Sequence, residues 1–257
     1  MDLAKKYVKS ISRKFQKLPI YYPGTKVEVG DIISFGKNIG GGPKKPFGEN
    51  VGIFGNVVKD TEFGNQIEVE YGALDRFYQF VSENEVSVQA GGTAELPDLA
   101  KGEFKFSFNK EGAIVIIASG VELVRMSNLS QLKRVINEAT ELLNWREYYI
   151  VSGVEIAGTA IVYQSQSKSG ELVLKANTEN IELFGEDIAG IDAGMDIQIK
   201  WSTDNSFVIP DAKNMTLFMK LIRVKSNGAL VGFNKAKGLG GVDGGELELE
   251  EFNIEDL

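Results

Sequence analysis

The sequence predicts an α+β protein: a twisted antiparallel β-sheet with a basic N-terminal helix and one central amphipathic helix. Two periodicities lead to this prediction. Apolar residues recur at three- and four-residue steps in residues 3–18 and again in residues 129–143, as in helices that cover a core. Elsewhere, short stretches alternate apolar and polar residues with a period of two, as in strands with one buried face.

The first predicted helix, residues 3–18, has two distinct faces. The apolar stripe consists of Leu3, Tyr7, Val8, Ile11, Phe15 and Leu18. The predicted lipid-binding residues are the bases Lys5, Lys6, Lys9, Arg13, Lys14 and Lys17. A surface helix docked on the core and a basic amphipathic helix that meets anionic lipid both fit this pattern, and the two interpretations are compatible.

Strands are expected along most of the remaining chain. Residues 36–48 are a glycine-rich loop without the spacing of a phosphate-binding loop, and residues 113–118 are apolar enough for a strand buried on both faces. The central helix is expected at 127–145, capped by Ser127, Asn128 or Ser130. The predicted strands are 26–29, 31–35, 86–90, 104–108, 113–118, 148–151, 154–163, 172–176, 195–201, 207–209 and 217–224.

The amino-acid composition excludes several classes of function. The 257 residues include no cysteine and no histidine, so thiol chemistry is excluded and the commonest general base is missing. We therefore expect no enzymatic activity, no cofactor and no metal site. No stretch approaches the ~20 apolar residues of a transmembrane helix, and lysines interrupt the apolar positions of the N-terminus. The expected location is the cytoplasm, because nothing indicates an oxidising compartment.

Charge is unevenly distributed. The net charge is −8, yet residues 1–20 hold six bases and one acid, whereas residues 238–257 hold seven acids and no base. Such asymmetry indicates a charged partner or a membrane surface. Outside the basic head the lysines and arginines are scattered, so no nucleic-acid partner is expected.

The sequence divides into a single domain, residues 1–232, and a glycine-rich link with an acidic tail, residues 233–257. The predicted cleavage region holds Gly240, Gly241, Asp243 and Gly244. We expect the autoinhibitory residues Phe252 and Ile254 to dock on the body while the acids mask the basic head. A disordered solubilising tail is the alternative.

Three segments carry a family resemblance. The basic head looks like the lysine-rich first helix of gasdermins. Residues 146–163, REYYIVSGVEIAGTAIVY, are similar to the strand that follows the mid-chain gasdermin helix. Residues 194–224, GMDIQIKWSTDNSFVIPDAKNMTLFMKLIRV, look like the closing pattern of strand, short loop and apolar strand. Over residues 1–225 the order of elements resembles the gasdermin pore-forming domain, in a short, bacterial or fungal-like form.

The resemblance implies a pore-forming protein of cell death or antiviral defence. Gasdermins refold two regions into hairpins, and many copies close into a membrane β-barrel, so the implied partners are anionic lipids, further copies of the chain, and an activating protease or partner protein. The implied membrane-inserting residues are Val86, Val88, Phe104, Phe106, Phe108, Ile161, Leu172, Leu174, Ile197, Ile199 and Trp201. The chain departs from the family in lacking an N-terminal lipidated cysteine and a large regulatory domain.

Two alternatives stay open at the sequence level. The same alternation is typical of a soluble β-rich module that binds a protein or a small ligand. A glycosidase-type carboxylate pair, Glu83 with Glu85 or Asp187 with Asp192, is the third interpretation.

Overall fold

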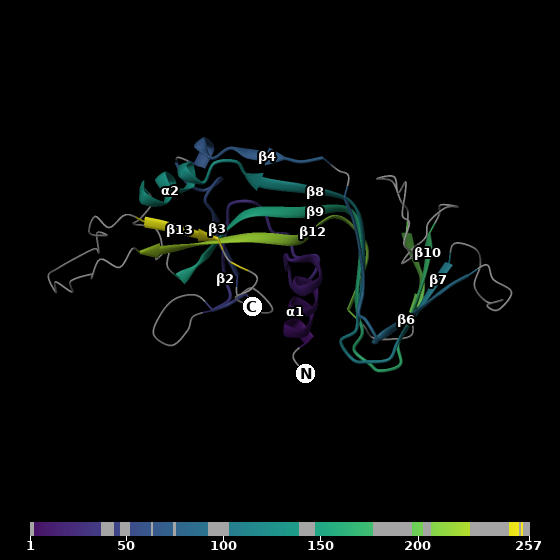
Figure 1. Ribbon diagram of the computed structural model, residues 1–257. Coiled ribbons are helices and arrows are strands. Elements are labelled where there is room, and N and C mark those ends of the chain that lie inside the picture. The colour runs from purple at the N-terminus through teal and green to yellow at the C-terminus, as the bar shows by residue number, and fades with distance from the viewer. Residues whose placement is uncertain are drawn as a thin grey trace.

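The computed structural model describes residues 3–36, 44–46, 52–62, 64–73, 76–91, 103–138, 147–176, 197–202, 207–226, 247–251 and 253. Over these residues the chain is an α+β protein in which antiparallel strands predominate and two helices pack beside them (Figure 1). The strands form a large sheet and a small sheet, and the long strands of the large sheet bend toward the small one (Figure 1). The predicted fold class is confirmed.

The large sheet is built around β9 (Tyr149–Gln164). This strand pairs with β8 (Ile114–Met126) on one side and with β12 (Phe207–Ser226) on the other. The other strands extend this centre: β4 (Val69–Tyr71) and β5 (Arg76–Val81) on β8, β2 (Asp31–Ser34) with β3 (Gly52–Asn56) beside the start of β9, and β1 (Leu18–Pro19) with β13 (Leu247–Glu251) on β12. A short 3-10 turn, Gly64–Gln66, precedes β4.

The small sheet has the strand order β11-β10-β7-β6. Its members are β6 (Val86–Ala90), β7 (Glu103–Phe108), β10 (Glu171–Ala176) and β11 (Ile197–Ser202). Two antiparallel pairs build it. The pair β6–β7 stands in the chain between β5 and β8, and the pair β10–β11 stands between β9 and β12. Each strand of the small sheet is therefore next in sequence to a strand of the large sheet.

Two predicted breaks are absent from the long strands. The sequence predicted separate strands on either side of residues 152–153 and of Pro210, but β9 and β12 are each continuous. Proline lacks the N–H that a ladder needs, and β12 accommodates Pro210 at a register shift between Ile209 and Ala212. The strand predicted at residues 26–29 is wrong, because this segment has no regular secondary structure.

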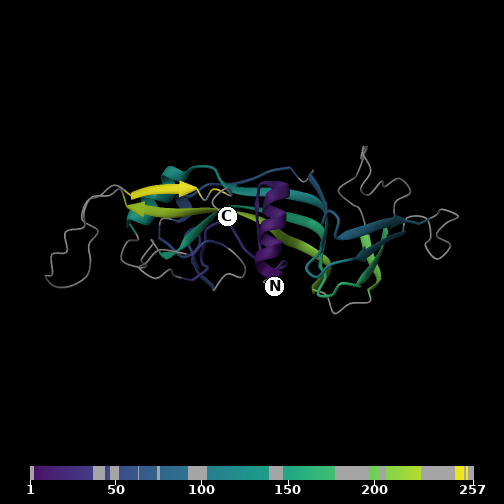
Figure 2. The ribbon, with the colours of Figure 1, turned by 60° about the horizontal axis from the view of Figure 1, so that its bottom comes forward.

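Helix α1 (Leu3–Phe15) packs on the inner side of the bend, across the strands of the large sheet (Figures 1 and 2). Helix α2 (Leu129–Glu138) covers the far end of the sheet and begins where predicted. Of the three proposed capping residues, Asn128 has the capping geometry, because its Oδ1 accepts the Ser130 backbone N–H at 3.0 Å. The end predicted for this helix, residues 139–145, lies outside the described residues.

Two apolar cores lie on opposite faces of the same strands. The larger core joins α1, α2 and the large sheet and includes Ile114 and Ile116. The smaller core joins the small sheet to Val115 and Ile117. Because successive side chains point to opposite faces of a strand, the start of β8 is buried on both faces, as its apolar run predicts.

Candidate functional site

The candidate site is α1 together with the residues that fasten it to the two sheets. Tyr7, Val8 and Ile11, three members of the predicted apolar stripe, are buried in the larger core. Phe15 packs against the rings of Tyr78 and Phe218, with ring centroids 5.2 and 5.4 Å apart. The stripe therefore holds the helix on the sheet in this conformation.

The predicted basic face divides into two groups. Lys5, Arg13 and Lys14 are exposed, and Lys9 is half-buried. Lys6 and Lys17 instead point inward to carboxylates of the sheets. Helical periodicity assigns residues to a face, but it does not reveal acids that come from strands distant in sequence. In this conformation the two lysines are paired with carboxylates, and their role in lipid binding stays a prediction.

Lys6 forms the first ion cluster, which lies between the two sheets. Its Nζ is 2.8 Å from Glu85 Oε2 and donates to the Glu111 carbonyl at 2.9 Å, while Lys110 Nζ is 2.9 Å from Glu85 Oε1. Glu85 belongs to the β5–β6 link, and residues 110–111 to the β7–β8 link. The cluster thus ties α1 to the two links that join the β6–β7 pair to the large sheet.

The charge state of Glu85 follows from these contacts. Burial by itself raises the pKa of the carboxyl, but hydrogen bonds and charge from Lys6 and Lys110 outweigh burial, so its pKa is lowered. Gly112 makes room for the cluster: its φ is +76°, and a Cβ there would lie 2.8 Å from Lys6 Cδ. A side chain at position 112 would therefore be strained and would push Lys6 away.

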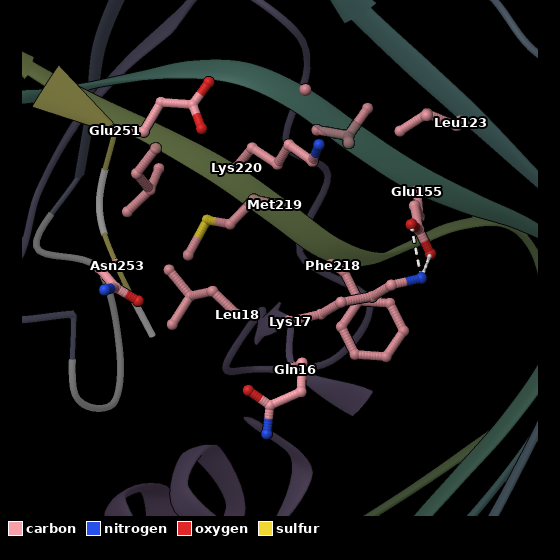
Figure 3. A pocket seen from close by; sticks show the side chains of 13 residues that line it. Gln16, Lys17, Leu18, Leu123, Glu155, Phe218, Met219, Lys220, Glu251 and Asn253 are labelled. Carbon is pink, nitrogen blue, oxygen red and sulfur yellow. Dashed lines mark hydrogen bonds and ion pairs between the residues drawn. The ribbon is translucent and has the colours of Figure 1, made fainter. Parts of the chain in front are cut away.

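Lys17 forms the second ion cluster, beyond the C-terminal end of α1. Its Nζ lies 2.7 and 2.8 Å from the two carboxylate oxygens of Glu155, next to the Phe218 ring (Figure 3). Arg76 NH1 reaches the same carboxylate at 3.2 Å, and the Tyr78 hydroxyl donates to it at 2.7 Å. Lys17 also contacts the Tyr78 hydroxyl and lies 4.5 Å from the centroid of that ring. Glu155, only 5% exposed, is thus satisfied by three side chains.

Sequence reasoning did not identify Glu85 or Glu155 as partners of the helix. For Glu155 a signal existed, because it is the one charged residue between Tyr149 and Gln164. A lone acid in a strand that is otherwise uncharged calls for a cationic partner. For Glu85 there was no comparable signal, since acids at strand ends are usually solvated.

The predicted membrane-inserting residues whose side chains are described belong to the smaller core; all lie in the small sheet except Ile161, which lies in β9. Val86 and Val88 stand opposite Phe108 and Phe106, and Phe106 stands opposite Leu172. The phenylalanines Phe104, Phe106 and Phe108 are buried in the smaller core with Ile161, Leu172 and Leu174, and Val86 and Val88 pack against it partly buried. In this conformation the face is turned toward protein, and its insertion into a membrane stays a prediction.

Strand β11 carries the other three residues of that set. Ile199 stands opposite Leu174 and Ile197 opposite Ala176, whereas a register shift places Trp201 opposite Val173. The side chains of β11 lie outside the described part of the structure.

A pocket of about 350 Å³ lies where the end of α1, the large sheet and the tail meet (Figure 3). Its apolar side includes Leu18, Phe218 and Met219. Its polar side carries the Lys17–Glu155 pair, the exposed Lys220, and Glu251 with Asn253 from the tail. Groups of both signs therefore border an apolar surface.

The tail joins the large sheet as β13, antiparallel to β12. Glu250 pairs with Arg223, so an acid of the tail is bound to the large sheet, and masking of the basic head by the tail stays a prediction. The predicted docking residues Phe252 and Ile254, and the predicted cleavage residues Gly240, Gly241, Asp243 and Gly244, lie outside the described residues.

Neither a membrane-spanning helix nor a metal site is found in the described ranges. No helix there is long and apolar enough to cross a bilayer. No group of acids, cysteines or histidines there is arranged to hold a metal ion.

Fold and site define a mainly antiparallel α+β protein with a basic helix fastened by two ion clusters. No protein-family model and no curated protein matches the chain. Among solved structures, the chain is similar to the cryo-EM structure of the Gasdermin A3 membrane pore, with 10% sequence identity and a TM-score of 0.34. The alignment covers 92% of this chain and 98% of that one. Values of this size do not place the chain in that family.

Proposed function

We propose that this chain is a membrane pore-forming protein that binds anionic lipid through α1 and oligomerises into a β-barrel. The observation that carries the proposal is the chain order of the two sheets. Each strand of the small sheet is joined by sequence to a strand of the large sheet, in the order β5–β6, β7–β8, β9–β10 and β11–β12. Straightening the links would turn four short strands into extensions of the large sheet.

Length and pattern support these extensions. A membrane-spanning strand needs ~9–11 residues with apolar side chains on the lipid face. Residues 82–91 and 166–176 supply strands of that length when the links are included. On β7, buried phenylalanines alternate with the half-buried Lys105 and Ser107, so the strand has one apolar and one polar face.

The proposed oligomerisation follows from the hydrogen bonds that the strand backbone needs in lipid. Strands that leave the small sheet carry N–H and C=O groups that lipid cannot satisfy, so only closure with neighbouring copies would pair them. The apolar face would leave a protein core for hydrocarbon, and its side chains would therefore stay out of water throughout.

Lipid attraction is proposed to begin at Lys5, Arg13 and Lys14, because these bases are exposed. Each base near an anionic surface contributes about 1 kcal/mol. Lys6 and Lys17 would reach lipid only after leaving Glu85 and Glu155. Anionic headgroups would then compete with these acids for the two lysines, which couples lipid binding to release of the small sheet.

We further propose that the tail holds the chain inactive until a protease or a partner protein displaces it. Strand β13 pairs with β12, which must reorganise at its other end when the β10–β11 pair extends. The chain would act without enzymatic chemistry or cofactor, first in the cytoplasm and then at a membrane, in cell death or antiviral defence.

Dye leakage from anionic liposomes tests the proposed function. We expect leakage from protein lacking residues 243–257, weaker leakage from the full chain, and none from liposomes of neutral lipid. Absence of leakage by both forms, at concentrations that bind the liposomes, would contradict the pore.

The pocket beside Lys17 favours a second candidate, a soluble β-rich binding module. Its volume of about 350 Å³ lies within the range of small-molecule sites, and charged groups border its apolar wall. This candidate predicts no leakage under any of the conditions above.

A further inference from the structure

The edge of β12 is covered by only a short strand. Five residues of β12, Ile222–Ser226, pair with the five residues of β13, Leu247–Glu251. Among the described strands, β13 pairs with no other. Residues 227–246 separate β12 from β13, the next described strand of the chain, so the two strands are not joined by a tight hairpin turn.

The paired residues are complementary in charge. Arg223 stands opposite Glu250, and Arg223 Nε lies 2.5 Å from Glu250 Oε2. Two residues along, Lys225 stands opposite Glu248. The register therefore repeats a basic residue opposite an acidic residue two positions along the strand.

The alternate positions are apolar. Ile222 and Val224 are buried in the larger core, and Val224 stands opposite Leu249. Along residues 222–225, the edge of β12 therefore alternates apolar and basic residues. Its complement is an extended segment in which acidic and apolar residues alternate, as in residues 247–250 of β13; Glu251, opposite Ile222, ends the alternation.

The pocket continues this edge. Beyond the Ile222–Glu251 pair it is lined by Lys220 and Leu221 of β12 and by Asn253 of the tail. Lys220 is exposed and forms no ion pair with the described residues. The tail contributes Glu251 and the uncharged Asn253 to the same pocket. A segment with an acid at the position of Asn253 would complement Lys220 as well.

We propose that the edge of β12, residues 220–226, is a binding site for an extended acidic segment of a partner protein, with β13 as its resident occupant. The partner would add a strand in the register of β13, with its acids on Arg223, Lys225 and Lys220 and its apolar residues toward the core. A tethered strand has an effective concentration in the millimolar range, so a partner must bind more tightly than β13 or arrive after β13 has left. This binding site does not depend on the proposed pore, because it requires only that a strand pairs with the edge of β12.

A labelled peptide of residues 246–253, ELELEEFN, tests the site on the full chain by fluorescence anisotropy. One variant, Glu248→Pro with Leu249→Pro, disables β13. Successive backbone N–H groups of a strand point to opposite sides, so one of two adjacent prolines always removes an N–H that bonds to β12. We expect this variant to bind the peptide about tenfold more tightly than the wild type. Adding Arg223→Glu should weaken binding severalfold, and a peptide with Glu250→Lys should restore it.

A scrambled peptide of the same composition is the matched control. Equal binding of the scrambled and native peptides, or no binding by the proline variant up to millimolar peptide while its melting temperature is unchanged, would overturn the proposal. Leakage plays no part in this experiment, so its outcome and that of the pore proposal are distinguishable.

A second variant keeps the proposal testable if the proline variant does not fold. In the otherwise unchanged chain, Asn253→Glu should strengthen tail docking and slow protease cleavage of residues 239–246 severalfold, whereas Asn253→Lys should accelerate it. Equal cleavage of the two variants would contradict the assigned role of Lys220.

Discussion

Lys6 and Glu85 are the residues whose interaction joins α1 to the small sheet. Their side chains are 8% and 16% exposed, so this ion pair is more shielded from water than an ordinary surface pair. Removing one partner leaves a charge in a partly desolvated position, which costs more than the pair contributes when intact. The pair is therefore suited to holding one conformation and to releasing it when a competing charge arrives.

The first prediction concerns the coupling between these two residues. Lys6→Met should lower the free energy of unfolding by about 1–3 kcal/mol. In a double-mutant cycle with Glu85→Gln, the coupling energy should be about 0.5–2 kcal/mol. Lys14→Met is the control, because Lys14 is exposed, and its effect should stay within about 0.5 kcal/mol. Urea unfolding of the wild type, the two single variants, the double variant and Lys14→Met measures these free energies. A coupling energy near zero would show that the ion pair does not hold the helix.

The second prediction concerns pH. The pKa of Glu85 is lowered in the folded chain from its ordinary value of 4.5, so its contribution to stability is complete above that value and is lost as pH falls through the folded pKa. The melting temperature of Glu85→Gln should therefore approach that of the wild type as pH decreases from 6 to 3. A constant difference between the two proteins over this range would contradict the assigned ionisation.

At the scale of elements, the segment formed by α1 and Lys17 carries bases that pair with acids of the fold, Lys6 and Lys17, and bases that are exposed, Lys5, Arg13 and Lys14. We predict that Lys5→Glu, Arg13→Glu and Lys14→Glu together abolish binding to anionic liposomes and leave the melting temperature nearly unchanged, because the three side chains are exposed. Lys17→Glu should instead lower the melting temperature, since it places a second acid against the buried Glu155. Liposome sedimentation that is unchanged by the triple substitution, or insensitive to salt, would exclude lipid binding by this face.

Strand β7 supplies the fourth prediction. Phe106 is fully buried in the smaller core, so Phe106→Asp places a carboxylate in an apolar site and should lower the melting temperature sharply. Lys105→Asp is the matched control on the opposite face, where the native side chain pairs with Glu171, and it should cost far less. Similar melting temperatures for the two variants would mean that the smaller core contributes little to stability.

The elements were predictable to different degrees. The stripe of α1, the buried run at the start of β8 and the alternation of β7 each reflect a local pattern, and each is confirmed. Continuity of β12 through Pro210 was not predictable, because the register shift that accommodates proline depends on its partner β9. For the same reason the partners of Lys6 and Lys17 were missed: their acids lie 79 and 138 positions away in sequence.

At the scale of the whole molecule, one helix packs against both sheets. One ion cluster lies on α1 between the sheets, the other lies just beyond the C-terminal end of α1 at the pocket, and the tail strand pairs with the C-terminal end of β12. We propose that the small sheet must leave α1 before its strands can enter a membrane.

Because the sequence has no cysteine, a single cross-link can test that claim. Lys6 Nζ and Glu85 Oε2 lie 2.8 Å apart, and cysteine is shorter than either side chain, so Lys6→Cys with Glu85→Cys can be joined by a cleavable thiol reagent whose spacer replaces the lost side-chain length. We predict that the cross-linked, tail-deleted protein still binds anionic liposomes but releases no dye, and that cleaving the link restores release. Equal dye release before and after cleavage would contradict the account, because the strands would then not need to leave the helix.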